Sequence, residues 1–296
     1  MTTRFVVVPG HASSMAEVVR QLREIRENSS WKHIEELANN SNFDVDCALS
    51  KCEHTAVPEN RYAQPLQFLL GYACYLSEPT DLQSIQGVAG HSLGEFLAAA
   101  IAGSISWNDG LRLVTRCGTV MDATHRVRPG AMSALLGFSE NEVSQLCSLG
   151  TRKSSDSLGI ANINRADQIV VSGDLHCLND MERHIKTAPG KRVVRLGIRG
   201  SAHSSIYEGR DPMNPILKTV SIKAPAIPLF LSTVSSPVNE ASQVREALAG
   251  ILVNQVNWVR TMHSFHQTVP GVSPRMLFHD RGMSSLLKPL PQIATS

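Results

Sequence analysis

The sequence predicts an α/β protein in which a parallel-sheet body carries a smaller inserted subdomain. In the body, short apolar segments alternate with amphipathic ones, and glycine or proline separates them. RFVVV at 4–8 is typical of a buried strand, and so is IQGVAG at 85–90. Helices are expected at 14–26, 64–76, 93–102 and 106–124. We expect the polar segment at 39–63 to be irregular.

The inserted subdomain is predicted from a β-α-β-β-α-β pattern, which is the ferredoxin-like arrangement. The strands are expected at 131–138, 158–164, 168–173 and 191–198, and the helices at 140–150 and 177–188. We therefore assign residues 128–199 to a ferredoxin-like small subdomain. Residues 1–127 and 200–296 form the large α/β catalytic subdomain.

The composition of the 296-residue chain excludes several classes of protein. Apolar residues make up 42% and charged residues 18%, which is enough for a sizeable core. The net charge of +2 argues against nucleic acid or an anionic membrane as the main partner. No apolar run approaches the roughly 20 residues that span a bilayer. The six cysteines form no CxxC pair, so no metal site is indicated, and we expect a cytoplasmic protein.

GHSLG at 90–94 places a serine between two glycines, after a short apolar strand and before a helix of small residues. A G-x-S-x-G pattern alone is weak, but this context is what a nucleophile elbow requires. Ser92 is therefore the candidate nucleophile. The backbone N–H of Leu93 is the first candidate donor to an oxyanion. The alternative is an ordinary strand-to-helix turn with a capping serine.

A serine nucleophile needs a base, and the chain offers eleven histidines. His203, in IRGSAHSS, follows the last strand of the small subdomain, where the chain returns to the body. Loops at such crossovers commonly carry function, so His203 is the candidate base. His91 adjoins Ser92 but points the other way along the backbone.

The chain resembles the malonyl-CoA:acyl-carrier-protein transacylase family, which includes the acyltransferase domains of polyketide and fatty acid synthases. The resemblance rests on FVVVPG, YAQPL, GHSLGE, AAAIAGSISWNDGLRLV and the distal histidine, and it runs from about residue 4 to about residue 287. It implies a hydrolase-like α/β body with a ferredoxin-like insert. It also implies no bound cofactor, since coenzyme A or phosphopantetheine thioesters are substrates, and it implies an acyl carrier protein as partner.

The resemblance also implies a mechanism. Ser92 would attack an acyl thioester while His203 takes its proton, and a carrier-protein thiol would then attack the acyl-serine ester. The oxyanion hole would use the N–H groups of Leu93 and His11. A main-chain carbonyl within VNQVNW would orient the histidine, which points to Asn257.

One departure from the family concerns the acyl pocket, to which Gln64 of YAQPL is also assigned. The family has an arginine before the glycine in LVxxRG, whereas LVTRCG here places Cys117 at that position. A guanidinium binds the free carboxylate of malonyl groups through two hydrogen bonds, and a thiol does not. Arg116 lies about 100° round the helix from Cys117. We expect an acyl group without a free carboxylate, or else a malonyl enzyme that uses Arg116 or Arg128.

Two further roles remain open from the sequence. Family members that lack the arginine include hydrolases that remove stalled acyl groups from carrier proteins, and a degenerate fold could serve as an interaction module. A basic docking face for an acidic carrier protein is expected on the last strand of the small subdomain. The alternative is a solvated edge strand whose lysine and arginine side chains protect it against aggregation. Its residues are Lys191, Arg192, Arg195 and Arg199.

Overall fold

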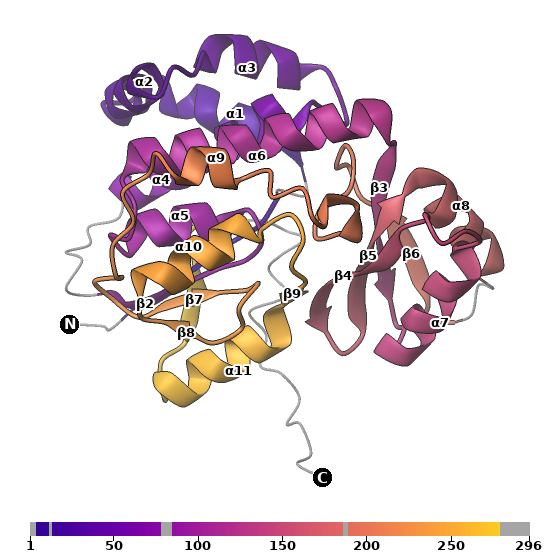
Figure 1. The fold of residues 1–296 in the computed structure, drawn as a ribbon. Helices are drawn as coiled ribbons and strands as arrows, with labels where there is room; N and C mark the ends of the chain where they lie inside the picture. Colours follow the sequence, from indigo (N-terminus) through magenta and orange to yellow (C-terminus); the bar gives the residue numbers. More distant parts are fainter. Residues whose placement is uncertain (1–3, 12–13, 78–84, 186–188, 279–296) are drawn as a thin grey trace.

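The computed structural model describes residues 4–11, 14–77, 85–185 and 189–278. Its body contains a five-stranded sheet (Figure 1), and the order of the strands is β10-β1-β2-β7-β8. β10, β1, β2 and β7 run parallel to one another, whereas β8 is antiparallel to β7. The strands are β1 (Arg4–Val8), β2 (Ile85–Gly90), β7 (Leu229–Leu231), β8 (Pro237–Val238) and β10 (Pro274–Met276). The predicted strands at 4–8 and 85–90, and their parallel arrangement, are confirmed.

Alternate residues of the body strands supply the cores on the two faces of this sheet. Val8 and Val88 belong to the large cluster with the helices of one face. Phe5 and Phe230 pack on the other face against α11 (Trp258–Thr268). The remaining body helices are α1 (Met15–Ile25), α2 (Ser30–Asn40), α3 (Val45–Glu53), α4 (Asn60–Ser77), α5 (Gly94–Ile101), α6 (Trp107–Val127), α9 (Asn214–Leu217) and α10 (Ala241–Ala249).

The prediction of an irregular segment at 39–63 was wrong. The end of α2, all of α3 and the start of α4 lie in it. Its polar residues occupy helix caps and outward faces: Asp44, for example, accepts the N–H of Cys47 at 2.9 Å and caps α3. Ala48 and Leu49 of the same helix are buried in the large cluster.

The small subdomain has the ferredoxin-like strand order β6-β3-β5-β4, with each strand antiparallel to its neighbours. Its elements are β3 (Gly130–Leu136), α7 (Glu140–Gly150), β4 (Leu158–Arg165), β5 (Gln168–Asp174), α8 (Leu175–His184) and β6 (Arg192–Arg195). A short strand from the C-terminal part, β9 (Val256–Asn257), extends this sheet in parallel with β4. The division at 128 and 199 stays a prediction. Residues 186–188 of the expected helix and 279–287 of the family resemblance lie outside the described residues.

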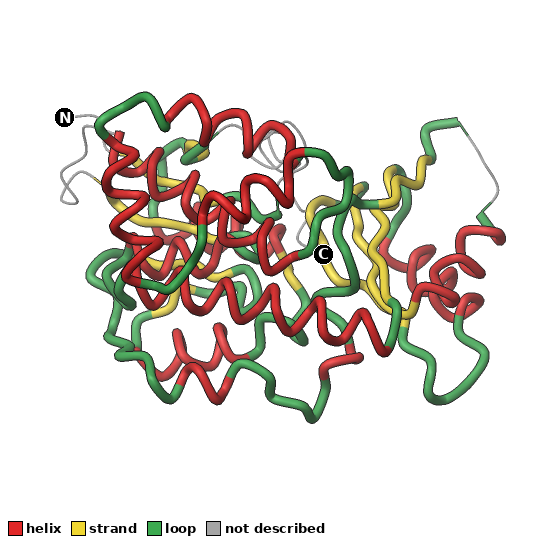
Figure 2. Tube along the Cα trace, turned by 90° about the horizontal axis from the view of Figure 1, so that it is seen from above, coloured by secondary structure: helices red, strands yellow, loops and turns green. Residues whose placement is uncertain are grey.

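The two faces of the small sheet have different neighbours. Figure 2 shows α7 and α8 at the end of the molecule, with the strands of this sheet between them and the body. The inner face buries Met132, Ala134 and Val170 against Ile198 and Ala202. The small subdomain therefore supports the segment that leads to His203.

None of the helices in the described ranges combines the length and the apolar character that a membrane crossing requires.

The first turn of α4 is fixed by a buried carboxylate of α6. Asp122 accepts the backbone N–H groups of Asn60 at 3.0 Å and of Arg61 at 2.9 Å, and the side-chain amide of Asn60 at 3.1 Å. Backbone N–H groups at a helix start have no partner within the helix, and the helix dipole favours a negative charge there. The carboxylate thus replaces a local cap.

We expect Asp122→Ala to lower the free energy of unfolding by about 2–4 kcal/mol, because it leaves buried donors without an acceptor. Asp122→Asn, which keeps one oxygen, should lose less. Chemical denaturation measures both, and Thr119→Ala on the exposed side of α6 is the control, with a change within about 0.5 kcal/mol. Equal stability of Asp122→Ala and the wild type would contradict this account.

Candidate functional site

Ser92 lies in a tight turn between β2 and α5. Its φ of 51° is left-handed, which is uncommon for a residue other than glycine. The flanking glycines make the turn possible: a Cβ on Gly90 would lie 2.6 Å from the Cα of Glu95, and one on Gly94 would lie 2.5 Å from the carbonyl oxygen of Val8. The geometry is that of a strand-to-helix elbow that presents a serine hydroxyl.

The structure brings His203 to this hydroxyl. The Oγ of Ser92 lies 2.7 Å from Nε2 of His203, although 111 residues separate them in the sequence. On the other side of the ring, Nδ1 lies 2.9 Å from the carbonyl oxygen of Asn254. Because a carbonyl only accepts hydrogen bonds, Nδ1 must carry the proton. Nε2 is then the acceptor for the serine hydroxyl, which is the tautomer that a general base needs.

The residue predicted to orient the histidine was wrong by three positions. VNQVNW is the correct segment, but the carbonyl that accepts from His203 belongs to Asn254. Asn257 lies in β9, where its N–H donates to the carbonyl of Ser232, and its side chain caps α11 by accepting the N–H of Arg260 at 3.0 Å. The carbonyl of Asn257 accepts the hydroxyl of Thr261, so it points into α11.

Burial controls the charge of the imidazole. It lowers the pKa of His203 to about 4; the hydrogen bond to the Asn254 carbonyl opposes this change, and nearby His91 adds to it. The ring is therefore neutral at pH 7 and able to accept a proton. His91 is also buried and neutral, and its Nε2 lies 2.8 Å from Oδ1 of Asn164 on β4. His91 thus joins the elbow to the small subdomain.

Glu95 is a residue of this site that the sequence reasoning missed. Its side chain is fully buried, and its carboxyl accepts the hydroxyl of Ser232 at 2.7 Å, and the N–H and hydroxyl of Thr233 at 2.8 and 2.9 Å. Ser232 in turn accepts the backbone N–H of Ser92 at 2.9 Å. The signal was a single acid in the otherwise apolar helix GEFLAAAI, since buried acids are rarely without a specific partner.

The two predicted oxyanion donors flank the serine. Leu93 follows Ser92 directly and precedes the first residue of α5. Gly10 lies against the elbow, because a Cβ there would lie 3.0 Å from the carbonyl oxygen of His91 and 3.4 Å from Cβ of Ser92. The next residue, His11, is therefore beside the turn.

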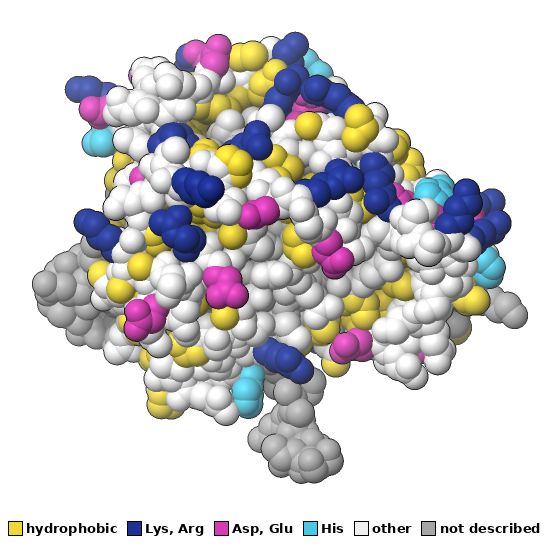
Figure 3. Space-filling model, in the orientation of Figure 1, with side chains coloured by type: hydrophobic (Ala, Val, Ile, Leu, Met, Phe, Trp, Pro, Cys, Tyr) yellow, Lys and Arg dark blue, Asp and Glu magenta, His cyan; other side chains and the backbone are white. Residues whose placement is uncertain are grey.

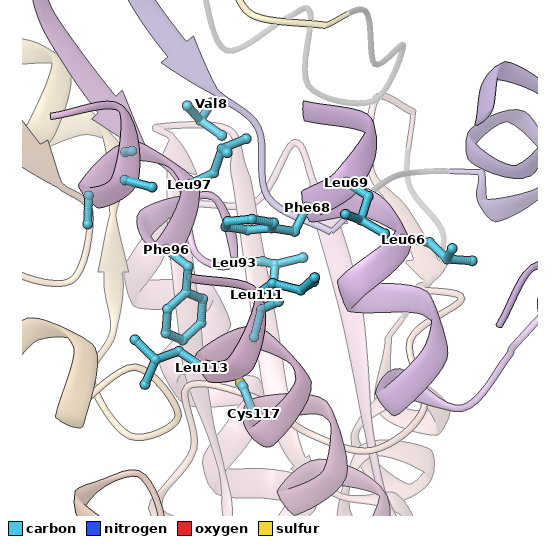
Figure 4. Packing of buried hydrophobic residues seen from close by; sticks show 14 of the residues in the cluster. Val8, Leu66, Phe68, Leu69, Leu93, Phe96, Leu97, Leu111, Leu113 and Cys117 are labelled. Carbon is cyan, nitrogen blue, oxygen red and sulfur yellow. The ribbon is translucent and has the colours of Figure 1, made fainter. Parts of the chain in front are cut away.

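The residues assigned to the acyl pocket do not all lie together. Figure 4 shows Cys117 on α6 beside the buried cluster of Leu113 and its neighbours. Burial raises the pKa of this thiol to about 12, so it carries no charge. The side-chain amide of Gln64, on α4, donates to the sulfur of Met121 one turn further along α6, at 3.1 Å. Arg116 is exposed, and its guanidinium lies 3.4 Å from the carbonyl oxygen of Pro212.

The predicted docking residues carry less net charge than the sequence indicates. Lys191 pairs with Glu142, Arg195 with Glu182 at 2.7 Å, and Arg199 with Glu59 at 3.6 Å; Arg192 is exposed. On the face shown in Figure 3, Lys and Arg side chains are spread over both subdomains rather than gathered in one patch.

Comparison with known proteins places this geometry in a family. Residues 83–280 match the acyl transferase domain family. The chain is 31% identical over 212 residues to the polyketide biosynthesis protein ThaF of Burkholderia thailandensis, covering 69% of this chain and 18% of that protein. It is 29% identical over 202 residues to a malonyl CoA-acyl carrier protein transacylase of Buchnera aphidicola, covering 67% of this chain and 64% of the relative. The chain thus spans less than two thirds of these curated relatives.

Solved structures share the fold. The malonyl CoA-acyl carrier protein transacylase of Coxiella burnetii superposes with a TM-score of 0.78 at 24% identity, over 97% of this chain and 90% of that one. An acyl-carrier-protein S-malonyltransferase of Bartonella henselae gives 0.79 at 24% identity, over 97% and 91%. These matches confirm the hydrolase-like α/β body with its ferredoxin-like insert. Because the family match covers most of the sequence, the chain belongs to the acyl transferase domain family, as its motifs predict.

Proposed function

We propose that this chain transfers an acyl group other than malonyl from a thioester donor to an acyl carrier protein, through an ester on Ser92. The observation that carries the proposal is the 2.7 Å contact between Ser92 Oγ and His203 Nε2 at the elbow. Relatives named malonyl CoA-acyl carrier protein transacylase support the carrier protein as partner. The donor is an acyl-CoA or acyl carrier protein in the cytoplasm, and no bound cofactor takes part.

The proposed reaction has two steps through one ester. Ser92 Oγ attacks the thioester carbonyl, and its proton passes to Nε2 of His203. The C–S bond breaks, and the imidazolium returns the proton to the leaving thiolate. In the second step a carrier thiol gives its proton to His203 and attacks the carbonyl of the acyl-serine. The bond between the acyl carbon and Ser92 Oγ breaks, and the imidazolium returns the proton to Oγ. The carbonyl of Asn254 keeps the ring oriented throughout.

The developing oxyanion would be stabilised by backbone dipoles. We assign the N–H groups of Leu93 and His11 to this role, because both residues lie beside Ser92 at the elbow. The N-terminus of α5 adds its partial positive charge. Since a carbonyl rather than a carboxylate supports His203, the imidazolium is less stabilised than in a Ser-His-Asp triad.

The preference for an acyl group without a carboxylate follows from the position of Cys117. Its neutral, buried thiol offers no positive charge. The surroundings of the two alternative arginines support this preference: Arg116 is exposed, and Arg128 holds the carboxylate of Asp174 at 2.6 Å. A malonyl carboxylate buried without a cation would lose several kcal/mol.

Hydrolysis is the second candidate function, in which water rather than a thiol opens the acyl-serine. The neutral thiol of Cys117 at the arginine's position favours it too, because hydrolytic members of the family that the chain resembles also lack the arginine. The docking face at Lys191, Arg192, Arg195 and Arg199 stays part of the transfer proposal. Three of these side chains are ion-paired, which reduces its expected contribution.

To test the function, the chain is incubated with acyl carrier proteins that bear acetyl, longer acyl or malonyl groups. Mass spectrometry then follows acyl-protein, free acid and transfer to a second carrier protein. We expect a Ser92-linked acyl adduct and transfer, with Ser92→Ala reducing both by roughly 10³-fold or more. The control is Ser148→Ala on the surface of α7, which should leave both unchanged.

Each outcome of that experiment decides between functions. Free acid without transfer supports the hydrolase. Equal inactivity of the wild type and Ser92→Ala on all substrates would reject an enzymatic function and leave the interaction module.

The acyl preference has its own measurement. We expect kcat/KM for acylation by an acetyl or longer thioester to exceed that for malonyl by about a hundredfold or more, because the carboxylate meets no cation. Cys117→Arg should reduce the ratio of kcat/KM between these thioesters and malonyl, and Cys117→Ala should leave it unchanged. Efficient malonyl loading by the wild type would contradict the preference whatever the variants do.

A pH prediction concerns Glu95. Burial raises its pKa to about 7, although the hydrogen bonds from Ser232 and Thr233 oppose the change. The folded chain therefore keeps this proton at pH values where the unfolded chain, with an ordinary Glu pKa, has released it. Protonation of Glu95 therefore adds to the free energy of unfolding at low pH, and this contribution is lost as pH rises toward 7. It amounts to about 1.4 kcal/mol for each unit by which the folded-state pKa exceeds the unfolded-state pKa.

Glu95→Gln removes this titration and keeps a side-chain carbonyl for Ser232. We expect the stability of the wild type, measured relative to Glu95→Gln by denaturation, to fall as pH rises from about 5 to about 7 and to change little above that. Parallel stability curves for the two proteins over this range would show that Glu95 does not titrate there.

A further inference from the structure

Three side chains that can bind metal converge on the small subdomain, away from Ser92 and His203. Asp156 lies in the loop before β4, and His176 and Cys177 lie in the first turn of α8. His176 Nε2 is 3.3 Å from Oδ1 of Asp156 and 3.3 Å from Sγ of Cys177. All three donor atoms lie within 4.8 Å of one another. No CxxC pattern marks this site, because the fold assembles it from residues 20 positions apart.

Two of the three separations between these donors match the spacing around a single tetrahedral ion. Zinc binds nitrogen at about 2.0–2.1 Å, carboxylate oxygen at about 2.0–2.2 Å and thiolate sulfur at about 2.3 Å, so neighbouring donors stand about 3.3–3.6 Å apart. Both measured separations, from His176 to Asp156 and to Cys177, are 3.3 Å. Little movement would be needed to bring the three atoms to an ion.

The surroundings hold Asp156 in position and leave its charge available. Its Oδ2 accepts the backbone N–H groups of Arg152 and Lys153, both at 2.9 Å, so that Oδ1 faces His176. Two arginines of this region pair with other carboxylates: Arg128 pairs with Asp174 at 2.6 Å and Arg152 with Asp180 at 3.0 Å. A carboxylate and a thiolate would balance the two charges of the ion.

We propose that Asp156, His176 and Cys177 bind one Zn²⁺, with a water molecule as the fourth ligand. A set of one sulfur, one nitrogen and one oxygen donor favours zinc over the hard cations Mg²⁺ and Ca²⁺. The side chain of Asp156 is 7% exposed and that of His176 is 66% exposed, so the ion would enter from the His176 side. This inference does not depend on the proposed function.

Zinc binding must displace the thiol proton to solvent. In the metal-free protein, burial and then the charges of Asp156 and Asp174 raise the pKa of Cys177 to about 11.

The ion would also fix a loop that contacts the segment of the proposed base. Ser157 follows Asp156, and its Oγ lies 2.7 Å from Oγ of Ser205 and 3.2 Å from Oγ of Ser204. These serines directly follow His203 in the sequence. Zinc would thus hold the loop at 152–157 between α8 and the returning chain.

Cobalt is the probe for the test, because a thiolate bound to Co²⁺ gives a charge-transfer absorption that a hydrogen-bonded thiol does not. The reduced, chelator-treated full chain is titrated with Co²⁺ and then with Zn²⁺. We expect the absorption to saturate at one equivalent and Zn²⁺ to abolish it. Cys177→Ser should remove the absorption, and His176→Ala and Asp156→Asn should each weaken binding by about tenfold or more.

Two variants and a second readout control this experiment. Cys74→Ser and His54→Ala change a half-buried thiol and an exposed imidazole outside the cluster, and binding should be unchanged. At the same Zn²⁺ concentration, the thermal midpoint of the wild type should rise more than that of His176→Ala, while the two metal-free proteins should melt alike because His176 is exposed. Absence of the absorption, its persistence in Cys177→Ser, or unchanged binding by His176→Ala would reject the site and leave a hydrogen-bonded cluster.

Discussion

The contact between the hydroxyl of Ser92 and the imidazole of His203 joins two residues that both have left-handed backbones, with φ of 51° and 53°. Such conformations cost about 1–3 kcal/mol each, and they persist only where surrounding contacts fix them. At Ser92 the packed glycines and the hydroxyl of Ser232 do so. At His203 the ring is held by the carbonyl of Asn254, and the N–H of the next residue bonds to the carbonyl of Leu252. The site therefore depends on anchors from separate parts of the chain.

The features that the sequence predicted are those encoded over a few residues. The elbow was predictable because strand, glycines and small-residue helix are contiguous, and the ferredoxin-like pattern because its strands and helices alternate with clear periods. The helices α2 and α3 were missed because their polar caps and outward faces resemble a loop. The carbonyl at Asn254 was missed because the direction of a main-chain oxygen depends on the path of the backbone and not on the residue type.

Interactions across long sequence separations were not predictable from spacing. Glu95 reaches Ser232 across 137 residues, and Asp156 reaches His176 across 20. In each pair the local sequence around one residue does not indicate its partner, and the order of the strands in the sheet brings the two together. Glu95 is the exception, because an acid in an otherwise apolar helix indicates a buried carboxyl. Such a carboxyl needs hydrogen-bond partners, since an unsatisfied carboxyl in a core is costly.

The buried imidazoles and the buried thiol of the proposed site are all uncharged at pH 7. His203 and His91 are both neutral at pH 7 because burial lowers the pKa of each to about 4. Cys117 is neutral for the same physical reason, since burial raises the pKa of its thiol. Under the proposed function, an acyl tail with a carboxylate would bring a charge against these neutral groups, whereas a neutral tail would exchange only water for apolar contact. A transient oxyanion differs from such a tail, because it forms at the elbow, where backbone dipoles are already oriented toward it.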